Sequence, residues 1–403
     1  MSLFFEFFRQ PLLQQARQTL CLLICLALFS SLPQAAQAEV ADKAAGWTPA
    51  ADPLPLPPAN EASIELMAGQ MLIVGFRGVR PEANPIIKDI EKYQLGGIIL
   101  FDRDYNFLTP TRNITSKEQL TRLVTALHNA SPYPLFVSVD QEGGKVRRLK
   151  SEKGFFPLPS AQDLGTEDPA NTREIAEQMA AELKEVGINL DFAPVVDVNI
   201  SPESPAIGAL KRAFSAEPAT VTAHARAFLD GMHAQGVLGS LKHFPGHGSA
   251  AVDTHKGVSD ISNTWQRDKE LYPYLALIPE DNADMVMVGH LMNSEIDPEY
   301  PASLSHATIT GLLRGELGFD GVVISDDLQM GAISSRYSLE EVVLLAINAG
   351  MDILLYGNNI SYDEELPGKV HACIVKLVNE GKISRERLEE SYTRICRLKQ
   401  KLE

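Results

Sequence analysis

The sequence predicts an α/β protein with the fold of a (β/α)8 TIM barrel, a single catalytic domain with extra helices at its C-terminal end. Three observations support this fold class. Eight short apolar runs recur along the chain, helix-like segments separate them, and polar residues follow directly after the runs. Continuous apolar strands that alternate with helices indicate a parallel sheet covered on both faces. Eight repeats over about 290 residues fit a barrel of the usual ~250-residue size.

The apolar runs are short and rich in β-branched residues, so each is predicted to be a strand. In chain order they are Met71–Phe76, Gly97–Phe101, Leu135–Val139, Leu190–Val196, Val237–Leu241, Met285–Val288, Val322–Ser325 and Ile353–Tyr356. The segments between them have the apolar spacing of helices. They are Asn84–Tyr93, Ser116–Asn129, Asp168–Val186, Ala216–Gln235, Thr264–Ile278, Ser305–Leu317 and Ser338–Ala349. The remainder, Leu366–Glu403, is predicted to form two helices that close the barrel.

Polar side chains gather where the predicted strands end. They are Asp102 and Arg103, Asp140 to Glu142, Asp197 and Asn199, Lys242 and His243, His290 and Asn293, Asp326 and Asp327, and Asn358 and Asn359. In a barrel these positions all face one rim, where such folds place their active sites. A surface without function would scatter charged residues between both ends of the strands, so this clustering indicates an enzyme.

The densest group of reactive side chains follows the fifth predicted strand. Within fourteen residues lie Lys242, His243, His247, Asp253 and His255. Proline and glycine residues interrupt this stretch and disfavour a helix, so we expect a loop that leaves the end of a strand. Loops in this position commonly carry the catalytic groups of α/β enzymes.

Two strand ends suggest a glycosidase. Asp326 follows the seventh strand so closely that it should project into the barrel mouth, where a carboxylate can act as a nucleophile. Asp327 beside it is equally able to cap the helix that follows. His255 is a candidate proton donor because imidazole titrates near neutral pH, and Asp253 is placed to orient its ring.

The chain resembles the β-N-acetylhexosaminidase branch of glycoside hydrolase family 3. The resemblance rests on three motifs, Asp140-Gln141-Glu142-Gly143-Gly144-Lys145-Val146-Arg147-Arg148, Lys242-His243-Phe244-Pro245-Gly246-His247-Gly248 with Asp253-Thr254-His255, and Ser325-Asp326-Asp327-Leu328. The Asp-Thr-His sequence marks this branch, because the β-glucosidase branch usually takes its acid from a glutamate outside the barrel.

The resemblance implies a retaining enzyme that hydrolyses terminal β-linked N-acetylglucosamine, on glycans such as peptidoglycan fragments, without a cofactor. It implies that Asp326 is the nucleophile and that His255 is the acid and base, oriented by Asp253. It also implies a set of sugar-binding residues, namely Asp140, Arg148, Arg212, Lys242 and His243. Two positions depart from the family pattern: the segment before Arg212 is two residues longer, and Lys145 stands where arginine is common.

Three other functions remain open from the residues. A metal-dependent barrel hydrolase would use His243, His247, Asp253 and His255 as ligands, since imidazole and carboxylate suit zinc. That class generally also has a His-x-His near the first strand, and no histidine lies near Met71–Phe76. A β-glucosidase-like glycosidase and a catalytically inactive sugar-binding barrel are the other two.

The N-terminus predicts export. Arg9 and Arg17 precede an apolar run of roughly ten residues, short of the ~20 needed to span a bilayer, and Ala36-Gln37-Ala38 suits a signal peptidase. We therefore expect a signal peptide over residues 1–38, cleaved after Ala38, a Pro- and Ala-rich linker over 39–61 and the hydrolase domain over 62–403. The mature protein would be secreted or periplasmic, without stable membrane insertion.

Charge and cysteine content limit the partners. Removing Arg9, Arg17 and Glu6 with the signal changes the net charge from −16 to −17, and this acidity argues against nucleic acid as a partner. Cys373 and Cys396 would remain in the mature chain, as a disulfide or as two separate buried thiols. The sequence favours no particular oligomeric state.

Overall fold

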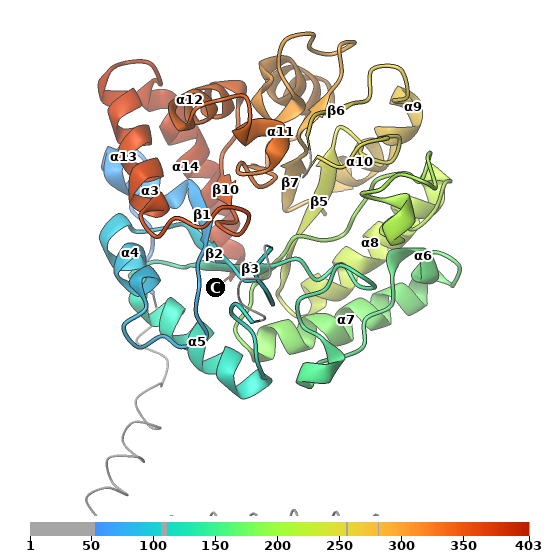
Figure 1. The fold of residues 1–403 in the computed structure, drawn as a ribbon, viewed down its shortest axis with the longest axis horizontal. Coiled ribbons are helices and arrows are strands. Elements are labelled where there is room, and N and C mark those ends of the chain that lie inside the picture. The colour runs from blue at the N-terminus through green and yellow to red at the C-terminus, as the bar shows by residue number, and fades with distance from the viewer. Residues whose placement is uncertain (1–52, 106–110, 255–256, 281, 403) are drawn as a thin grey trace, which may run out of the picture. The chain divides into compact units, whose positions relative to one another are not determined.

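The computed structural model describes residues 53–105, 111–254, 257–280 and 282–402, which contain the predicted barrel (Figure 1). The described residues belong to one compact unit, Ala50–Glu403. Residues 1–52 lie outside the described residues, and with them the predicted signal peptide and most of the predicted linker.

The central sheet has eight parallel strands, one at each predicted position. They are β1 (Leu72–Gly75), β2 (Gly97–Ile99), β3 (Phe136–Val139), β4 (Leu190–Asp191), β5 (Leu238–Phe244), β7 (Met285–Val288), β9 (Val322–Ser325) and β10 (Leu354–Tyr356). Their order is β10-β1-β2-β3-β4-β5-β7-β9, so neighbours in the chain are neighbours in the sheet. A parallel bridge between Ile324 and Ile353 joins the two edge strands. The sheet is therefore an almost closed barrel, as predicted.

The fifth strand is longer than predicted. The sequence placed Lys242 and His243 on a loop, whereas β5 continues through both residues to Phe244. The backbone explains this, because Val196 N–H donates to the Lys242 carbonyl at 2.8 Å and Gly289 N–H donates to the Phe244 carbonyl at 2.9 Å. The neighbouring elements thus hold the two polar residues inside the sheet until Pro245 ends the strand.

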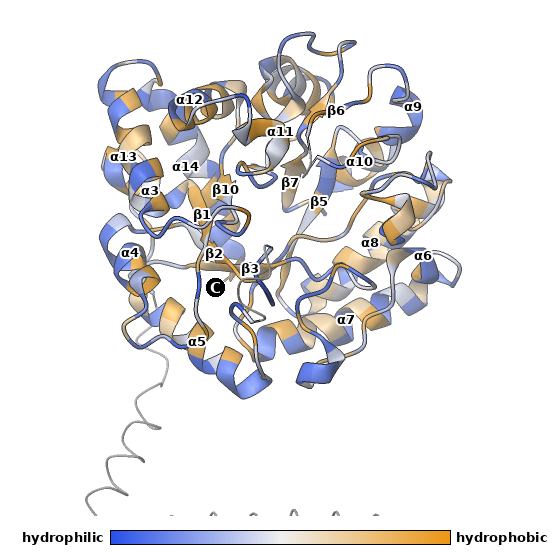
Figure 2. Cartoon of the chain, viewed as in Figure 1, coloured by the Kyte–Doolittle hydropathy of each residue, from blue (hydrophilic) through white to orange (hydrophobic). Residues whose placement is uncertain are grey.

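Helices surround the strands and cover the outside of the barrel (Figure 1). They are α3 (Ile64–Gln70), α4 (Pro85–Tyr93), α5 (Lys117–Ala130), α6 (Ala161–Leu164), α7 (Pro169–Glu185), α8 (Pro218–Ala234), α9 (Arg267–Glu270), α10 (Tyr272–Leu277), α11 (Gly331–Ser334), α12 (Leu339–Ala349), α13 (Leu366–Asn379) and α14 (Arg385–Lys399). Their outer faces are hydrophilic, while the strands at the centre are hydrophobic (Figure 2). None of the helices in the described ranges combines the length and apolar character needed to cross a bilayer.

Two predicted helices differ from the sequence expectation. The segment Thr264–Ile278 contains two short helices, α9 and α10, because Pro273 lies in the first turn of α10 and cannot donate a backbone hydrogen bond to a preceding helix. The segment Ser305–Leu317 forms wide π-helical turns over η5 (Ala307–Glu316). A small parallel pair, β6 (Ser259–Asp260) with β8 (Leu291–Met292), was not predicted.

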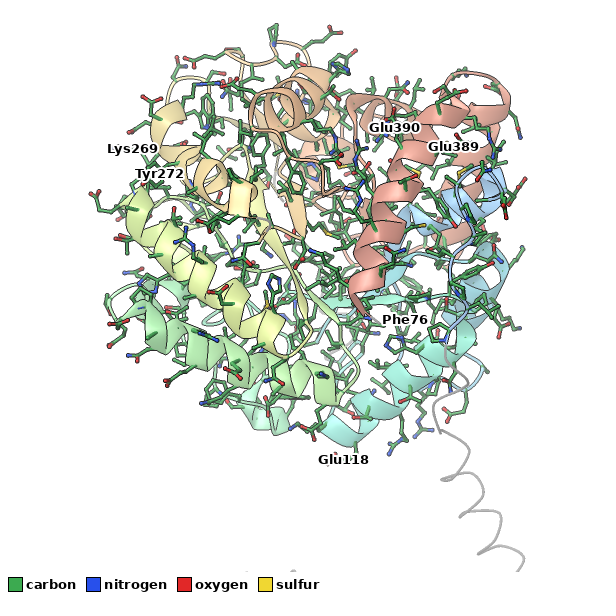
Figure 3. All side chains as sticks on the ribbon, turned by 180° about the vertical axis from the view of Figure 1, so that it is seen from behind. Phe76, Glu118, Lys269, Tyr272, Glu389 and Glu390 are labelled. Atoms are coloured by element: carbon green, nitrogen blue, oxygen red, sulfur yellow. The ribbon has the colours of Figure 1, made fainter. Side chains whose placement is uncertain are left out.

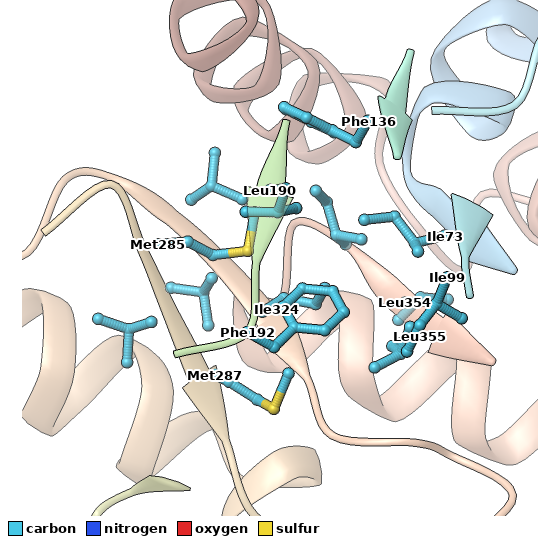
Figure 4. Close-up of a cluster of buried hydrophobic side chains, with 14 of the residues drawn as sticks. Ile73, Ile99, Phe136, Leu190, Phe192, Met285, Met287, Ile324, Leu354 and Leu355 are labelled. Atoms are coloured by element: carbon cyan, nitrogen blue, oxygen red, sulfur yellow. The ribbon is translucent and has the colours of Figure 1, made fainter. Parts of the chain in front are cut away.

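The inside of the barrel is filled by apolar side chains from most of the strands. Figure 4 shows Ile73, Ile99, Phe136, Leu190, Phe192, Met285, Met287, Ile324, Leu354 and Leu355 gathered in one cluster, and each is at most 2% exposed. The barrel is therefore a packed core and not a channel. This packing fixes the strand ends that carry the polar residues.

A buried lysine closes the barrel at the opposite end. Lys399, the last residue of α14, is 1% exposed. Its ammonium nitrogen donates to Gln70 Oε1 at 2.7 Å, to the Gly96 carbonyl at 2.9 Å and to the Pro134 carbonyl at 2.5 Å. These acceptors precede β1, β2 and β3. Burial lowers the pKa of Lys399 to about 7, so the hydrogen bonds offset a substantial desolvation cost.

The turn after α5 and the last helix hold the end of the predicted linker, and the C-terminal helices carry Cys373 and Cys396. Leu54 N–H donates to the Pro132 carbonyl at 2.8 Å, and the Tyr392 hydroxyl on α14 donates to the Pro57 carbonyl at 2.9 Å. Cys373 on α13 and Cys396 on α14 are free thiols. Of the two alternatives, the structure therefore holds separate thiols.

We expect Lys399→Ala to lower the free energy of unfolding by about 3 kcal/mol, because it leaves a cavity and removes a donor from three buried acceptors. The matched control is Lys382→Ala, whose side chain is 46% exposed and should contribute within about 0.5 kcal/mol. Chemical denaturation of both variants measures the difference. Equal stability of the two would contradict the role assigned to Lys399.

Candidate active site

The carboxyl ends of the strands surround an open cavity of roughly 740 Å³. Seven of the eight residues predicted from the sequence line it together, namely Asp140, Arg148, Arg212, Lys242, His243, Asp253 and Asp326. The eighth, His255, lies outside the described residues. Side chains that are 100 or more positions apart in the chain thus converge on one cavity, as the barrel topology requires.

An alternating row of charges forms one wall of the cavity. Lys242 Nζ lies 2.9 Å from Asp140 Oδ1 and 2.7 Å from Glu142 Oε1. Arg212 binds Glu142 in a bidentate pair, with Nε and Nη2 each 2.7 Å from a carboxylate oxygen. Arg148 Nη2 lies 3.0 Å from Asp140 Oδ2. Arg212 therefore reaches the site despite the longer segment before it.

The buried charges of this row stabilise one another. Burial acts to raise the pKa of Glu142, but the adjacent Arg212 and Lys242 lower it to about 2. Burial likewise opposes ionisation of Asp140, and Lys242 and Arg148 overcome it to lower the pKa of that carboxyl. Burial would lower the pKa of Lys242, but Asp140 and Glu142 raise it. All of these groups are therefore charged at neutral pH, and each depends on its neighbours.

The turn that carries Arg148 is fixed by Gln141. The Gln141 side-chain oxygen accepts the backbone N–H groups of Arg148 at 2.9 Å and Leu149 at 3.0 Å. Its backbone N–H donates to Asp191 Oδ1 on β4 at 2.8 Å. Burial raises the pKa of Asp191 to about 8, so this side chain is mostly protonated at neutral pH. Gln141 thus connects β4 to the turn that holds Arg148 at the cavity.

A second group of polar residues centres on Asp197, after β4. Its Oδ1 accepts the backbone N–H of His243 at 3.1 Å and of His247 at 2.7 Å, and its Oδ2 lies 2.7 Å from His243 Nδ1. The other ring nitrogen of His243 lies 3.2 Å from Arg212 Nη2, which can only donate. The Nδ1 atom of His243 therefore donates to Asp197, and Nε2 accepts from Arg212.

His247 stands behind His243 and is uncharged. Burial lowers the pKa of His247 to about 4. The two rings meet edge to face with centroids 5.7 Å apart. His247 Nε2 lies 3.5 Å from Thr254 Oγ1, which links the motif to the segment that carries Asp253.

Two adjacent aspartates follow β9, and they differ in their contacts. Asp327 Oδ1 accepts the backbone N–H groups of Gln329 and Gly357, each at 3.0 Å, so it stabilises the turn. Asp326 lines the cavity, and its Oδ1 accepts the Asp327 N–H at 2.8 Å. The sequence left open whether Asp327 caps the following helix. In the structure its carboxylate instead caps the turn before α11.

His290 is a supporting residue whose role the sequence did not indicate. It is fully buried, and its Nε2 donates to the Asp327 carbonyl at 2.9 Å while Nδ1 lies 2.7 Å from Ser303 Oγ. It therefore holds the backbone beside Asp326. Glu142 and Asp197 were noticed as strand-end residues, but their function as partners of Arg212 and His243 depends on side-chain directions that a single sequence does not give.

The described residues offer little to a metal ion. Within them, no group of three or more His, Cys, Asp and Glu side chains is arranged to hold one. His243, one of the four ligands considered, has both ring nitrogens engaged by Asp197 and Arg212. Using it as a ligand would break the contact that orients its ring.

The fold and the site define an α/β-barrel enzyme whose strand ends carry carboxylates paired with lysine and arginine side chains. Residues 63–398 match the model of the glycosyl hydrolase family 3 N-terminal domain. The chain belongs to this family and is a glycoside hydrolase. Its substrate is a carbohydrate.

Relatives agree with the family. The chain is 38% identical over 306 residues to a beta-hexosaminidase of Stenotrophomonas maltophilia, covering 73% of this chain and 86% of the relative. A family 3 beta-N-acetylglucosaminidase structure from Paenibacillus sp. superposes with a TM-score of 0.77 at 33% identity over 85% of this chain, which spans 63% of that larger protein. A beta-N-acetylhexosaminidase structure from Beutenbergia cavernae has a TM-score of 0.75 at 32% identity, over 84% of this chain and 99% of its own.

We expect Glu142→Gln to destabilise the fold at neutral pH by roughly 3 kcal/mol, because it leaves Lys242 and Arg212 short of one negative charge. The folded-state pKa of Glu142 is lowered from 4.5 to about 2, so the stability due to ionised Glu142 is present above 4.5 and is lost as the pH falls toward 2. The difference between the two proteins should therefore shrink on acidification over that window. Denaturation at several pH values measures it, and parallel pH curves would contradict the pairing.

Proposed function

We propose that this glycoside hydrolase is a retaining β-N-acetylhexosaminidase that releases terminal β-linked N-acetylglucosamine. The observation that carries the proposal is the shared cavity, with Asp326 at the tip of β9 and Asp253 on the segment after β5 among its lining residues. The names of the relatives support the same activity.

The reaction has two steps at one anomeric carbon. In the first, an oxygen of Asp326 attacks that carbon, the bond to the leaving oxygen breaks, and His255 gives its proton to the leaving group. In the second, His255 takes a proton from water, the water oxygen bonds to the same carbon, and Asp326 is released. Asp253 orients His255 and stabilises its charged form. Each step inverts the carbon, so the product keeps the β configuration.

The charged wall binds the outer hydroxyl groups of the terminal sugar. Asp140 supplies acceptors, while Arg148, Lys242 and Arg212 supply donors, and His243 lies beside them. Because these groups are held by one another before substrate arrives, little of their rotamer freedom remains to be lost on binding. The wall therefore suits a polar ring with several hydroxyls.

Basic residues at the cavity support peptidoglycan fragments as the natural substrate. Although the chain carries a net charge of −16, the cavity lining includes Arg103, Lys145, Arg147 and Lys150. Among the described residues, neither Lys145 nor Arg147 lies within ion-pair distance of a carboxylate. Lys145 Nζ donates to the Ala209 carbonyl, and Arg147 Nη1 donates to the Gly144 carbonyl. Cations placed in this way attract an acidic leaving group, such as a wall fragment with carboxylates.

Export fits this substrate. A signal peptide over residues 1–38, cleaved after Ala38, and a linker over 39–61 would place the hydrolase domain of residues 62–403 outside the cytoplasm or in the periplasm, where wall fragments occur. N-terminal sequencing of the protein isolated from its native host tests the cleavage site.

A panel of aryl β-glycosides tests the activity. We expect hydrolysis of the N-acetylglucosamine substrate, at least about tenfold weaker hydrolysis of the glucose analogue, and loss of about 10³-fold or more in Asp326→Asn. A preference for glucose would favour the β-glucosidase alternative, and loss of activity in chelator would favour a metal-dependent hydrolase. If the protein binds the sugar but neither turns it over nor is trapped by a fluorinated glycosyl fluoride, it is a binding protein.

We expect Lys145→Glu combined with Arg147→Glu to raise KM for an acidic disaccharide-peptide about tenfold and to change the aryl substrate less than about twofold. Lys88→Glu combined with Lys92→Glu, which changes two exposed cations on α4, is the matched control for charge. Steady-state kinetics at low and high salt measure the effect, which should weaken with salt. Equal effects on both substrates would argue against an acidic leaving group.

A further inference from the structure

A buried carboxyl lies behind the cavity motif and outside the cavity lining. Glu270 ends α9 and is 1% exposed, whereas its neighbours Lys269 and Tyr272 lie on the outer edge of the molecule (Figure 3). Its Oε1 accepts a hydrogen bond from the Ser249 hydroxyl at 2.6 Å. Its Oε2 is buried without a hydrogen bond of good geometry, while the nearby backbone N–H of Gly248 acts to lower the pKa of the carboxyl.

The backbone of the motif Lys242–Gly248 packs directly against this carboxyl at Gly246. Gly246 has φ +128°, and a Cβ at that position would lie 2.5 Å from Glu270 Oε2. A side chain there would collide with the carboxylate, so the Pro-Gly sequence after β5 leaves the space that Glu270 fills. Trp265, just before α9, adds a second contact, because its indole N–H donates to the Pro245 carbonyl at 3.1 Å.

Ser249 begins the segment that carries Asp253 into the cavity. At the far end of that segment, the Thr254 carbonyl accepts the Ala332 N–H at 3.2 Å, and Thr254 Oγ1 lies 3.5 Å from His247 Nε2. The segment is therefore attached at both ends, to Glu270 through Ser249 and to α11 and the motif through Thr254. A change at either end would displace Asp253 without touching the sugar-binding wall.

We propose that Glu270 is a positioning residue for the proton-donor segment, acting through its hydrogen bond to Ser249. The inference rests on the proposed function, because it assigns the segment 249–254 to acid catalysis. Burial raises the pKa of Glu270 to about 7, which is the mark of a carboxyl held in an unfavourable site. An apolar residue would fill the same space at lower desolvation cost. What the carboxyl adds is the hydrogen bonds that it accepts, from the Ser249 hydroxyl at 2.6 Å and from the Gln266 N–H at 3.4 Å, and the first of these reaches the segment 249–254.

The experiment compares leaving groups. The sugar released from a disaccharide needs a proton to leave, whereas dinitrophenolate leaves without one. We expect Glu270→Ala to lower kcat/KM per active site about 30-fold for the disaccharide and less than about threefold for the dinitrophenyl glycoside. Active sites are counted by trapping with a fluorinated glycosyl fluoride. Glu270→Gln keeps an acceptor for Ser249 and should remain within about threefold of wild type on both.

Asp268→Ala, which removes an exposed carboxylate from the same helix, is the matched control and should leave both substrates unchanged. Should Glu270→Ala fail to fold, Ser249→Ala removes the other half of the hydrogen bond and should give the same leaving-group split. Equal losses on both substrates, no loss, or a glutamine variant as impaired as alanine would overturn the inference. Failure of wild type to hydrolyse either N-acetylglucosaminide would instead overturn the proposed function.

Discussion

The site depends on one buried cation. Lys242 lies within β5, 1% exposed, and is tolerable there because Asp140 and Glu142 after β3 approach it from the neighbouring side of the barrel. Removing a charge from water costs several kcal/mol unless partners satisfy it, so Lys242 obliges both carboxylates to stay ionised and close. Glu142 in turn requires Arg212, and Asp140 requires Arg148. Five side chains from three regions of the chain are thereby fixed in one arrangement.

Asp197 fixes the backbone of the motif at the end of β5, just as Lys242 fixes the charged side chains around it. One carboxylate accepts N–H groups from two residues of the motif and also orients the His243 ring. Since Arg212 approaches the other nitrogen of that ring, the two groups of polar residues meet at His243. Lys242 and His243 are adjacent in the sequence and both line the cavity, and each belongs to a different one of these two groups.

The sequence allowed the fold and seven of the residues that line the cavity to be predicted, and the reasons are physical. Strands buried on both faces must be continuously apolar, and strand ends in a barrel must share a rim, so positions such as Asp140 and Asp326 could be found without coordinates. The position of Lys242 inside β5 could not be found, because backbone pairing with Val196 decides it and Pro245 only ends it. The roles of His290 and Lys399 were equally hidden, since each contacts residues distant in the chain.

The two aspartates after β9 have different roles in the turn that follows this strand. Both line the cavity, and the sequence could assign either to a turn. The carboxylate of Asp327 accepts two backbone N–H groups from different elements, and His290 fixes its carbonyl. Asp326 is set in place by the same turn, because its Oδ1 accepts the Asp327 N–H at 2.8 Å, so the contacts of Asp327 also position the residue proposed to react.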